Sequence, residues 1–368
     1  MSNPFAQPPP PATKLGRYRQ FSPRAGVHIS PIILGGMSIG DKWEKVGLGA
    51  MNKESSFQLL DAYYKAGGNA IDTANVYQDG SSEEIIGEWM EARGVRDQMF
   101  IMTKYSNNLK MADNTVHQKV MYTGNHVKSM ILSVEESLRR LRTNYIDLLF
   151  VHWWDYMTSI EEVMDGLHNL VTQGKVLYLG ISDTPAHIIA EANTYASWSV
   201  LERDFEREYI ELARRHNMAI TPFGVLAGGK IRSDEEEKRR RETGEAVLDH
   251  GWERNEDEKK MSNALEKVAK EIGAKHVTSV AIAYIMQRTP YVFPIIGGRK
   301  VEHLMNNLEA LDLVLKPEHM RFIESVIPFN PGWPYNLFGN DESDYNMLYK
   351  SAGHLDKWPL QQAIRPSV

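Results

Sequence analysis

The chain has 368 residues, contains no cysteine and carries a formal net charge of -6 at pH 7. Its length fits one large α/β barrel or two ordinary domains. The negative balance argues against non-specific nucleic-acid binding, and the lack of cysteine excludes disulfides, thiolate nucleophiles and cysteine-ligated metals. No apolar run approaches the roughly 20 residues of a membrane span, and the N-terminus lacks the features of a signal peptide. We therefore expect a cytoplasmic protein with no membrane or nucleic-acid partner.

Short apolar strands alternate along the chain with segments of helical periodicity, after a proline-rich start at 1–13 that predicts a disordered lead-in. The predicted strands are 32–34, 69–71, 99–102, 145–151, 176–181, 218–221 and 292–296. The predicted helices are 54–66, 82–92, 126–141, 159–172, 202–216, 277–288 and 300–310. Strands and helices that alternate at these lengths indicate a parallel sheet.

Seven clear strands predict a (β/α)8 TIM barrel with a shortened or missing sixth β/α unit, spanning 14–335. An open doubly wound sheet is the alternative, but no G-x-G-x-x-G follows the first strand. The charged stretch 230–260 predicts a solvated loop and helix face, with a lid as the alternative. The tail 336–368 is expected to pack near the substrate side.

The segment 183–200 is too short for a complete β/α unit, because a parallel crossover alone takes a dozen or more residues. A helix at 184–193 would leave 194–200 as a weak strand candidate. Three explanations stay open: a tight connection with Tyr195–Val200 as the strand, a splice or gene-model variant that folds poorly, or an altered barrel that has lost activity.

Four polar residues fall at or just after the carboxyl ends of predicted strands: Asp72, Tyr77, Lys104 and His152. Active sites of (β/α)8 barrels lie at that end. Tyrosine has an ordinary pKa near 10, and the Lys104 ammonium is expected to lower it, with Asp72 holding the lysine in place. His152 would orient a carbonyl. The set predicts a proton donor for an oxygen that gains negative charge. The histidines show no ligand cluster, so no metal site is expected.

The stretch GGNAIDTANVYQDGSSEEIIGEWM, together with Lys104 and His152, resembles the catalytic motifs of the aldo-keto reductases from about residue 15 to 335. The segments GGMSIGDKW, GKVLYLGISDTPA, VLERDFERE and PIIGGRKVEHL are similar to the fungal aryl-alcohol dehydrogenase and norsolorinic acid reductase branch. This resemblance implies NADPH-dependent reduction of an aromatic or polyketide-like aldehyde or ketone, or the reverse oxidation, in fungal secondary metabolism. Tyr77 would be the general acid. An NADP-binding but catalytically impaired regulatory or scaffold protein is the alternative.

The same resemblance implies which residues bind NADP(H). They are Ser182, Asp183, Phe223, Val225, Leu226, Gly228, Lys230, Gly297, Arg299, Lys300, His303 and Asn307. The family more usually has asparagine where this chain has Asp183, and often a stacking tyrosine where it has Ile220. Arginine and lysine at 299 and 300 suit a phosphate dianion, which favours NADP over NAD.

Aromatic and apolar residues of the first loop, the fourth strand end and the tail are candidates for the substrate pocket. They are Met37, Trp43, Trp153 and Trp333. Such residues suit a flat apolar substrate. Packing that seals the barrel edge is an equally good interpretation of the tail aromatics. The sequence predicts no oligomeric state.

Overall fold

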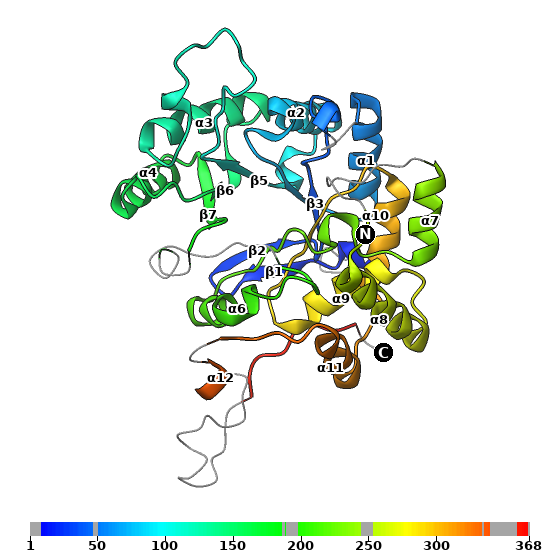
Figure 1. Ribbon diagram of the computed structural model, residues 1–368. Coiled ribbons are helices and arrows are strands. Elements are labelled where there is room, and N and C mark those ends of the chain that lie inside the picture. Colours follow the sequence, from blue (N-terminus) through cyan, green and yellow to red (C-terminus); the bar gives the residue numbers. More distant parts are fainter. Residues whose placement is uncertain are drawn as a thin grey trace, which may run out of the picture.

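The computed structural model describes residues 9–46, 51–185, 188, 198–243, 253–332, 335–338 and 359–366 (Figure 1). Its first element of sheet is an antiparallel hairpin, β1 (Arg19–Ser22) with β2 (Ala25–Ile29), which we did not predict. Phe21 and Ile29 of this hairpin belong to the same core cluster as Phe100, at the start of β5, and Phe293, just before β8. These partners lie at or near the amino-terminal ends of their strands, so the hairpin covers the end of the sheet away from the predicted site.

Six parallel strands form the central sheet in the order β7-β6-β5-β4-β3-β8. Their bounds are β3 (Ile33–Gly35), β4 (Ala70–Asp72), β5 (Phe100–Tyr105), β6 (Ile146–Val151), β7 (Val176–Ile181) and β8 (Ile295–Ile296). All residues of β4, β5 and β6 are buried, as expected for parallel strands covered on both faces. The parallel sheet that the sequence predicted is confirmed.

The predicted strand 218–221 lies beside the β8 end of the sheet. Ile220 forms a parallel bridge with Val292, its N–H donates to the Tyr291 carbonyl at 2.9 Å, and Phe293 N–H donates to the Ile220 carbonyl at 2.8 Å. Together with the six strands, this segment gives seven of the eight positions of a barrel. Within the described residues, no strand pairs with the outer edge of β7.

In chain order, the short segment 183–200 follows β7. Most of this segment, including the larger part of the predicted helix 184–193 and residues 195–197, lies outside the described residues. Residues 198–200 are described and form no strand. Trp198 is fully buried and stacks on Phe205 with ring centroids 5.3 Å apart. Its backbone N–H donates to the Phe223 carbonyl at 3.3 Å. Trp198 therefore belongs to the hydrophobic core.

Helices follow the strands and pack outside the sheet (Figure 1). Those predicted from periodicity are α1 (Lys53–Lys65), α2 (Ser81–Arg93), α3 (Val127–Arg140), α4 (Ile160–Thr172), α6 (Phe205–His216), α9 (Val277–Arg288) and α10 (Val301–Asn307). Side-chain caps set two of their starts: Asn52 accepts from Ser55 N–H before α1, and Ser159 accepts from Glu162 N–H before α4.

The charged stretch folds into α7 (Asp234–Thr243) and the start of α8 (Glu256–Ile272). The expectation that its charges are solvated is wrong for three residues near this stretch, because Arg232, Glu237 and Arg254 are buried. Glu237 accepts hydrogen bonds from both arginines, and Arg254 also pairs with Asp234. The ion cluster ties the start of α7 to the segment that precedes α8.

The C-terminal part adds α11 (Pro317–Val326) and the short α12 (Tyr335–Phe338), neither of which we predicted. Trp333 and most of the tail 336–368 lie outside the described residues, as do residues 1–8 of the predicted lead-in. Thr13, at the end of that lead-in, donates to the Ala66 carbonyl at 2.6 Å. Among the described helices, none has the length and apolar character needed to cross a membrane.

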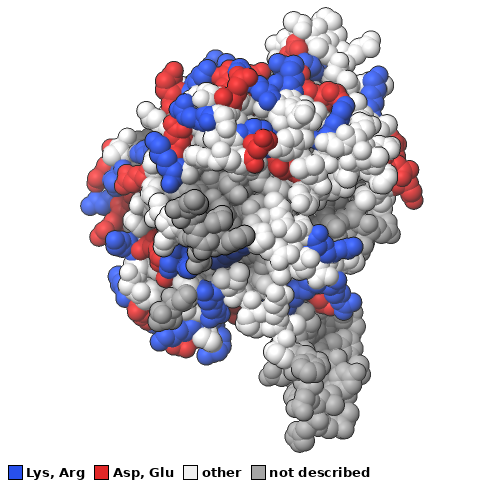
Figure 2. Space-filling model, turned by 180° about the vertical axis from the view of Figure 1, so that it is seen from behind, with Lys and Arg blue, Asp and Glu red and all other residues white. Residues whose placement is uncertain are grey.

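Acidic and basic side chains are interspersed over the face shown in Figure 2. Neither sign forms a continuous stripe among the described residues of this face. A basic stripe is what nucleic-acid phosphates require. The lack of a nucleic-acid partner stays a prediction from the net charge.

Candidate active site

The four predicted catalytic residues meet at the carboxyl ends of β4, β5 and β6. Asp72 is the last residue of β4, Lys104 lies in β5, and His152 directly follows β6. Tyr77 begins a short 3-10 turn (Tyr77–Gly80) after β4. The parallel register places Asp72 opposite Met102 and Lys104 opposite Phe150, so the three residues follow one another in steps of two residues across neighbouring strand ends. The structure therefore brings together the four residues that the sequence singled out, and their catalytic role stays a prediction.

Lys104 is almost completely buried, with 1% of its surface exposed, and it is held by two acceptors. Its Nζ donates to Asp72 Oδ1 at 2.5 Å and to the Thr73 carbonyl at 2.7 Å. Burial lowers the pKa of Lys104, but the Asp72 carboxylate and the hydrogen bonds to Asp72 and Tyr77 together raise it by more, so the net shift is upward. A permanent ammonium group therefore lies beneath Tyr77, with Nζ 4.9 Å from the tyrosine ring centroid.

The pKa of Tyr77 departs from the sequence expectation. Burial raises it, the Lys104 charge and hydrogen bond lower it, and the net direction is upward from the ordinary value of 10.0. The expectation of a lowered pKa is therefore wrong for this structure, because desolvation outweighs the ammonium. Tyr77 consequently holds its proton at neutral pH, as a proton donor must.

His152 lies beside Tyr77, with ring centroids 5.9 Å apart and the rings nearly perpendicular. Burial, with a further contribution from the Lys104 charge, lowers the pKa of His152 to about 3. The imidazole is therefore neutral over the physiological range. Asn107 Nδ2 lies 3.1 Å from His152 Nδ1. We did not predict a role for Asn107, since only the folded loop after β5 brings it to the histidine.

A cavity of about 1810 Å³ extends from these residues along the strand ends. Eighteen of the twenty residues proposed from the sequence for catalysis, cofactor or substrate line it. They are Met37, Trp43, Asp72, Tyr77, Lys104, His152, Trp153, Ser182, Asp183, Phe223, Val225, Leu226, Gly228, Gly297, Arg299, Lys300, His303 and Asn307. The remaining two are Lys230, which is not part of the lining, and Trp333, which lies outside the described residues.

Lys230 is buried away from the cavity. Its Nζ donates to the Glu253 carbonyl at 2.9 Å and lies 3.5 Å from Glu258 Oε2. The Lys230 side chain therefore connects the end of the segment 221–230 to the start of α8. Its proposed contact with the cofactor therefore has no support from the geometry.

Two tryptophans line the cavity on either side of the cluster. The Trp43 ring lies edge-on to Tyr77 at 6.3 Å, and its Nε1–H donates to Asp79 Oδ1 at 2.9 Å. The Trp153 ring lies 5.8 Å from that of His152 and is 51% exposed. The cavity therefore offers aromatic surface next to Tyr77 and His152.

Ser182 and Asp183 line the cavity just beyond the end of β7. Ser182 Oγ donates to Asp183 Oδ2 at 2.7 Å, and Asp183 has a positive φ of 43°. Burial raises the pKa of Asp183, against the lowering effects of the Ser182 hydrogen bond and the Lys104 charge. Aspartate in place of the family's more usual asparagine is thus compatible with its partly buried position.

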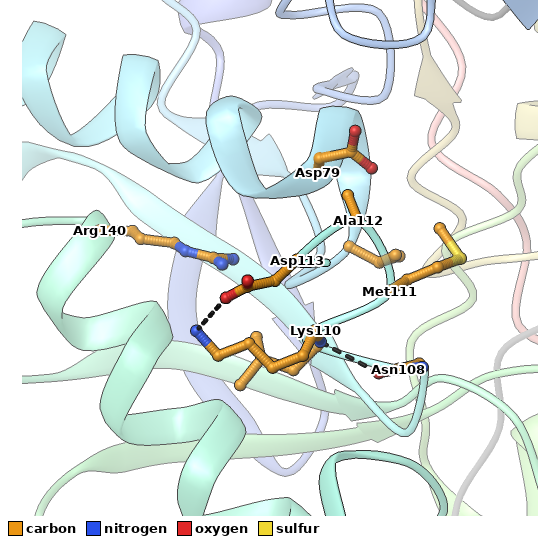
Figure 3. Close-up of a pocket in the computed structure, with 9 residues that line it drawn as sticks. Asp79, Asn108, Lys110, Met111, Ala112, Asp113 and Arg140 are labelled. Carbon is orange, nitrogen blue, oxygen red and sulfur yellow. Dashed lines mark hydrogen bonds and ion pairs between the residues drawn. The ribbon is translucent and has the colours of Figure 1, made fainter. Parts of the chain in front are cut away.

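A separate, smaller cavity of about 150 Å³ lies between the turn that follows Tyr77 and the loop after β5 (Figure 3). Asp79, Asn108, Lys110, Asp113 and Arg140 contribute to its lining, and Lys110 Nζ lies 3.8 Å from Asp113 Oδ2. None of the four catalytic candidates borders it. No group of three or more potential metal ligands occurs among the described residues.

The fold and the site together define an α/β protein of the barrel type with a tyrosine–lysine–aspartate–histidine centre at the strand ends. The model of the aldo/keto reductase family matches residues 31–328. The chain belongs to the aldo/keto reductase family. The resemblance drawn from its motifs is confirmed.

Named relatives are fungal oxidoreductases. The chain is 60% identical to the aryl-alcohol dehydrogenase [NADP(+)] of Phanerodontia chrysosporium, over 99% of each chain, and 43% identical to norsolorinic acid reductase A of Aspergillus parasiticus, over 97% of this chain and 95% of that one. A crystallised thermostable aldo-keto reductase shares the fold with a TM-score of 0.63 at 24% identity, over 84% of this chain and 99% of that one.

The alignment with the Phanerodontia protein covers 383 positions, which exceeds the 368 residues of this chain by 15. At least 15 positions of the alignment therefore have no residue in this chain.

Proposed function

We propose that this chain uses NADPH to reduce an aromatic or polyketide-like aldehyde or ketone to the alcohol, or catalyses the reverse oxidation, in fungal secondary metabolism. One observation carries the proposal: a buried Lys104–Asp72 pair lies under Tyr77, which is next to His152, and all four residues line a large cavity. The names of the two fungal relatives support the substrate class and the cofactor.

The cavity has the size and donors that a dinucleotide phosphate needs. It runs from the catalytic cluster, past Ser182 and the 223–229 loop, to Arg299, Lys300 and His303. Guanidinium and ammonium groups suit a phosphate dianion. A Cβ built on Gly228 would have no neighbour within 4 Å, so space for a ligand is left along this loop. The bound cofactor would supply the hydride.

Proton delivery would then fall to the chain itself. A carbonyl oxygen that contacts Tyr77 and His152 gains negative charge as its carbon accepts the hydride. The Tyr77 hydroxyl gives that oxygen its proton, and the Lys104 ammonium stabilises the phenolate that forms. Trp43 and Trp153 provide aromatic surface for a flat substrate.

The Arg299→Met variant tests the choice of cofactor. We expect it to weaken NADPH binding about tenfold or more, because a charge-assisted hydrogen bond contributes about 1.5–3 kcal/mol, and to leave NADH binding unchanged. Quenching of protein fluorescence measures both affinities. Arg24→Met, at an exposed site in the turn between β1 and β2, is the matched control. Equal loss of both cofactors, or none, would contradict the assignment of Arg299.

A regulatory or scaffold protein that binds NADP without turnover is the second candidate. The observation that favours it is the edge of β7, which has no strand partner among the described residues. Ser182, which directly follows β7, lines the cavity. Tight NADPH binding without reduction of any aromatic aldehyde or ketone would select this candidate. Cytoplasmic location remains a prediction from composition, which cell fractionation would test.

A further inference from the structure

Asn107 lies next to Nδ1, one of the two ring nitrogens of His152. The amide nitrogen Nδ2 lies 3.1 Å from Nδ1 of the imidazole. In this orientation of the amide, the NH₂ group donates and Nδ1 accepts, which requires that Nδ1 carry no proton. In a neutral imidazole, the single proton then resides on Nε2.

We propose that Asn107 is a positioning residue that fixes His152 as the Nε2–H tautomer, so that this ring can donate a hydrogen bond to the substrate oxygen. The inference rests on the proposed reductase function. It adds a residue outside the tyrosine–lysine–aspartate–histidine centre and assigns a direction to the hydrogen bond of the histidine.

The backbone before Asn107 is bent in a way that supports this role. Ser106 has φ 105°, in a region that residues other than glycine rarely adopt. Such backbone strain is retained where the surroundings over-determine it, often at functional sites. Ser106 follows β5 directly and is itself buried, so the bend sets the direction in which Asn107 leaves the strand.

A buried asparagine holds the loops of Asn107 and His152 together. Asn125 is fully buried, and its Nδ2 donates to Ser106 Oγ and to the Trp153 carbonyl, both at 2.7 Å. Asn125 and Asp155 also bond reciprocally through N–H groups and side-chain oxygens at 2.7 Å. Hydrogen bonds thus connect the neighbours of Asn107 to the neighbours of His152. They hold the two loops that carry the amide and the imidazole together.

The other ring nitrogen is left for a ligand. The residues that the structure describes form no hydrogen bond to His152 Nε2, and the histidine lines the large cavity with Tyr77. The low pKa of His152 agrees with this arrangement, since a neutral ring is required for Nδ1 to accept. The proton on Nε2 can therefore be donated in a hydrogen bond to a ligand in the cavity.

Nitrogen-15 NMR of the cofactor-free protein, labelled at histidine, tests the tautomer without reference to activity. The chain has 12 histidines, so the His152 signals are identified as those lost in His152→Gln. We expect the wild type to show Nδ1 without and Nε2 with a proton. Asn107→Asp, which replaces the donor by an acceptor of the same shape, is expected to move the proton to Nδ1.

The kinetic consequence follows from the loss of one preorganised donor. We expect Asn107→Asp to lower kcat for carbonyl reduction on the order of 100-fold, with NADPH affinity unchanged. Asn108→Asp is the matched control: Asn108 is the next residue, accepts from Lys110 N–H at 3.0 Å and borders the smaller cavity instead (Figure 3). It should retain the wild-type tautomer and rate.

Two results would overturn the inference: Nδ1 protonated in the wild type, or an unchanged tautomer in Asn107→Asp. Asn107→Leu provides a second variant, in which loss of the donor should yield a mixture of tautomers. A wild type that has the expected tautomer but reduces no carbonyl would defeat the proposed function and leave the hydrogen-bond assignment intact.

Discussion

At the scale of single residues, burial sets the direction of the pKa shift of Tyr77 and His152, whereas the partners of Lys104 set the direction of its shift. The Lys104 ammonium opposes the rise in the pKa of Tyr77 but does not reverse it. Burial also lowers the pKa of His152 to about 3. Both candidate donors are consequently neutral at physiological pH, and Lys104 carries the positive charge between them. This division of roles suits proton donation to a developing oxyanion.

The lowered pKa of His152 predicts a specific pH dependence of stability. The unfolded chain binds a proton near pH 6.5 and the folded chain only near 3, so the free energy of unfolding falls as pH drops between these values. The slope from this group is at most about 1.4 kcal/mol per pH unit. Urea unfolding of the wild type and His152→Gln between pH 4 and 7 should show a flatter dependence in the variant. Parallel curves would show that His152 is not protonated preferentially in the unfolded chain.

At the scale of elements, close helix packing places the catalytic loop. Arg140, near the end of α3, donates to the Asn75 carbonyl at 2.7 Å and pairs with the fully buried Glu83 of α2. Asn75 lies between Asp72 and Tyr77, and its N–H donates to the Lys104 carbonyl at 3.1 Å. The crossing of α2 and α3 is therefore connected directly to the loop that carries Tyr77.

Gly87 makes that crossing possible, and its substitution tests the link. A Cβ at Gly87 would lie 2.2 Å from the Arg140 carbonyl oxygen and 2.7 Å from the Leu141 backbone. We expect Gly87→Ala to lower the free energy of unfolding by about 1–3 kcal/mol, because backbone atoms must move. Gly26→Ala in β2 is the control, since nothing lies within 4 Å of its added Cβ. Equal unfolding free energies for the two variants in urea would contradict this account.

The sequence predicted the elements whose signals are local. The apolar run 145–151 indicated a buried strand, and β6 (Ile146–Val151) is buried throughout. The β1–β2 hairpin was missed because its strands are short and its Pro23-Arg24 turn lacks an asparagine–glycine signal. The buried pairs of Arg232 and Arg254 with Glu237 were missed because a charge-rich segment looks solvated until its partners are known. The contact of Asn107 with His152 was missed for the same reason, since only the folded loops bring the two side chains together.

At the scale of the whole molecule, the sheet is one strand short of a closed barrel among the described residues. The outer edge of β7 lacks a strand partner there, and Leu177 and Leu179 of β7 are 46% and 37% exposed. Unpaired edges with apolar side chains promote association between chains. The four site residues still lie together, because Asp72, Lys104 and His152 are carried by β4, β5 and the end of β6, which are paired with one another.

Leu179→Lys tests the consequence of that edge. We expect the variant to aggregate more slowly than the wild type on warming, because a charge on an edge strand opposes pairing with another chain. Light scattering at matched concentrations measures the rate. Val171→Lys places the same charge at an equally exposed aliphatic site on α4 and serves as the control. A similar delay in both variants would mean that net charge, and not the β7 edge, controls aggregation.

The proposal that Tyr77 protonates the substrate is tested most directly by comparing the wild type with Tyr77→Phe at saturating NADPH. NADPH oxidation is followed with an aromatic aldehyde, and the NADPH affinity of each protein is measured by fluorescence quenching. We predict turnover by the wild type and a loss of roughly 10²–10⁴-fold in kcat for Tyr77→Phe, with NADPH affinity unchanged. Equal turnover by the two proteins, or a folded wild type that does not bind NADPH, would contradict it.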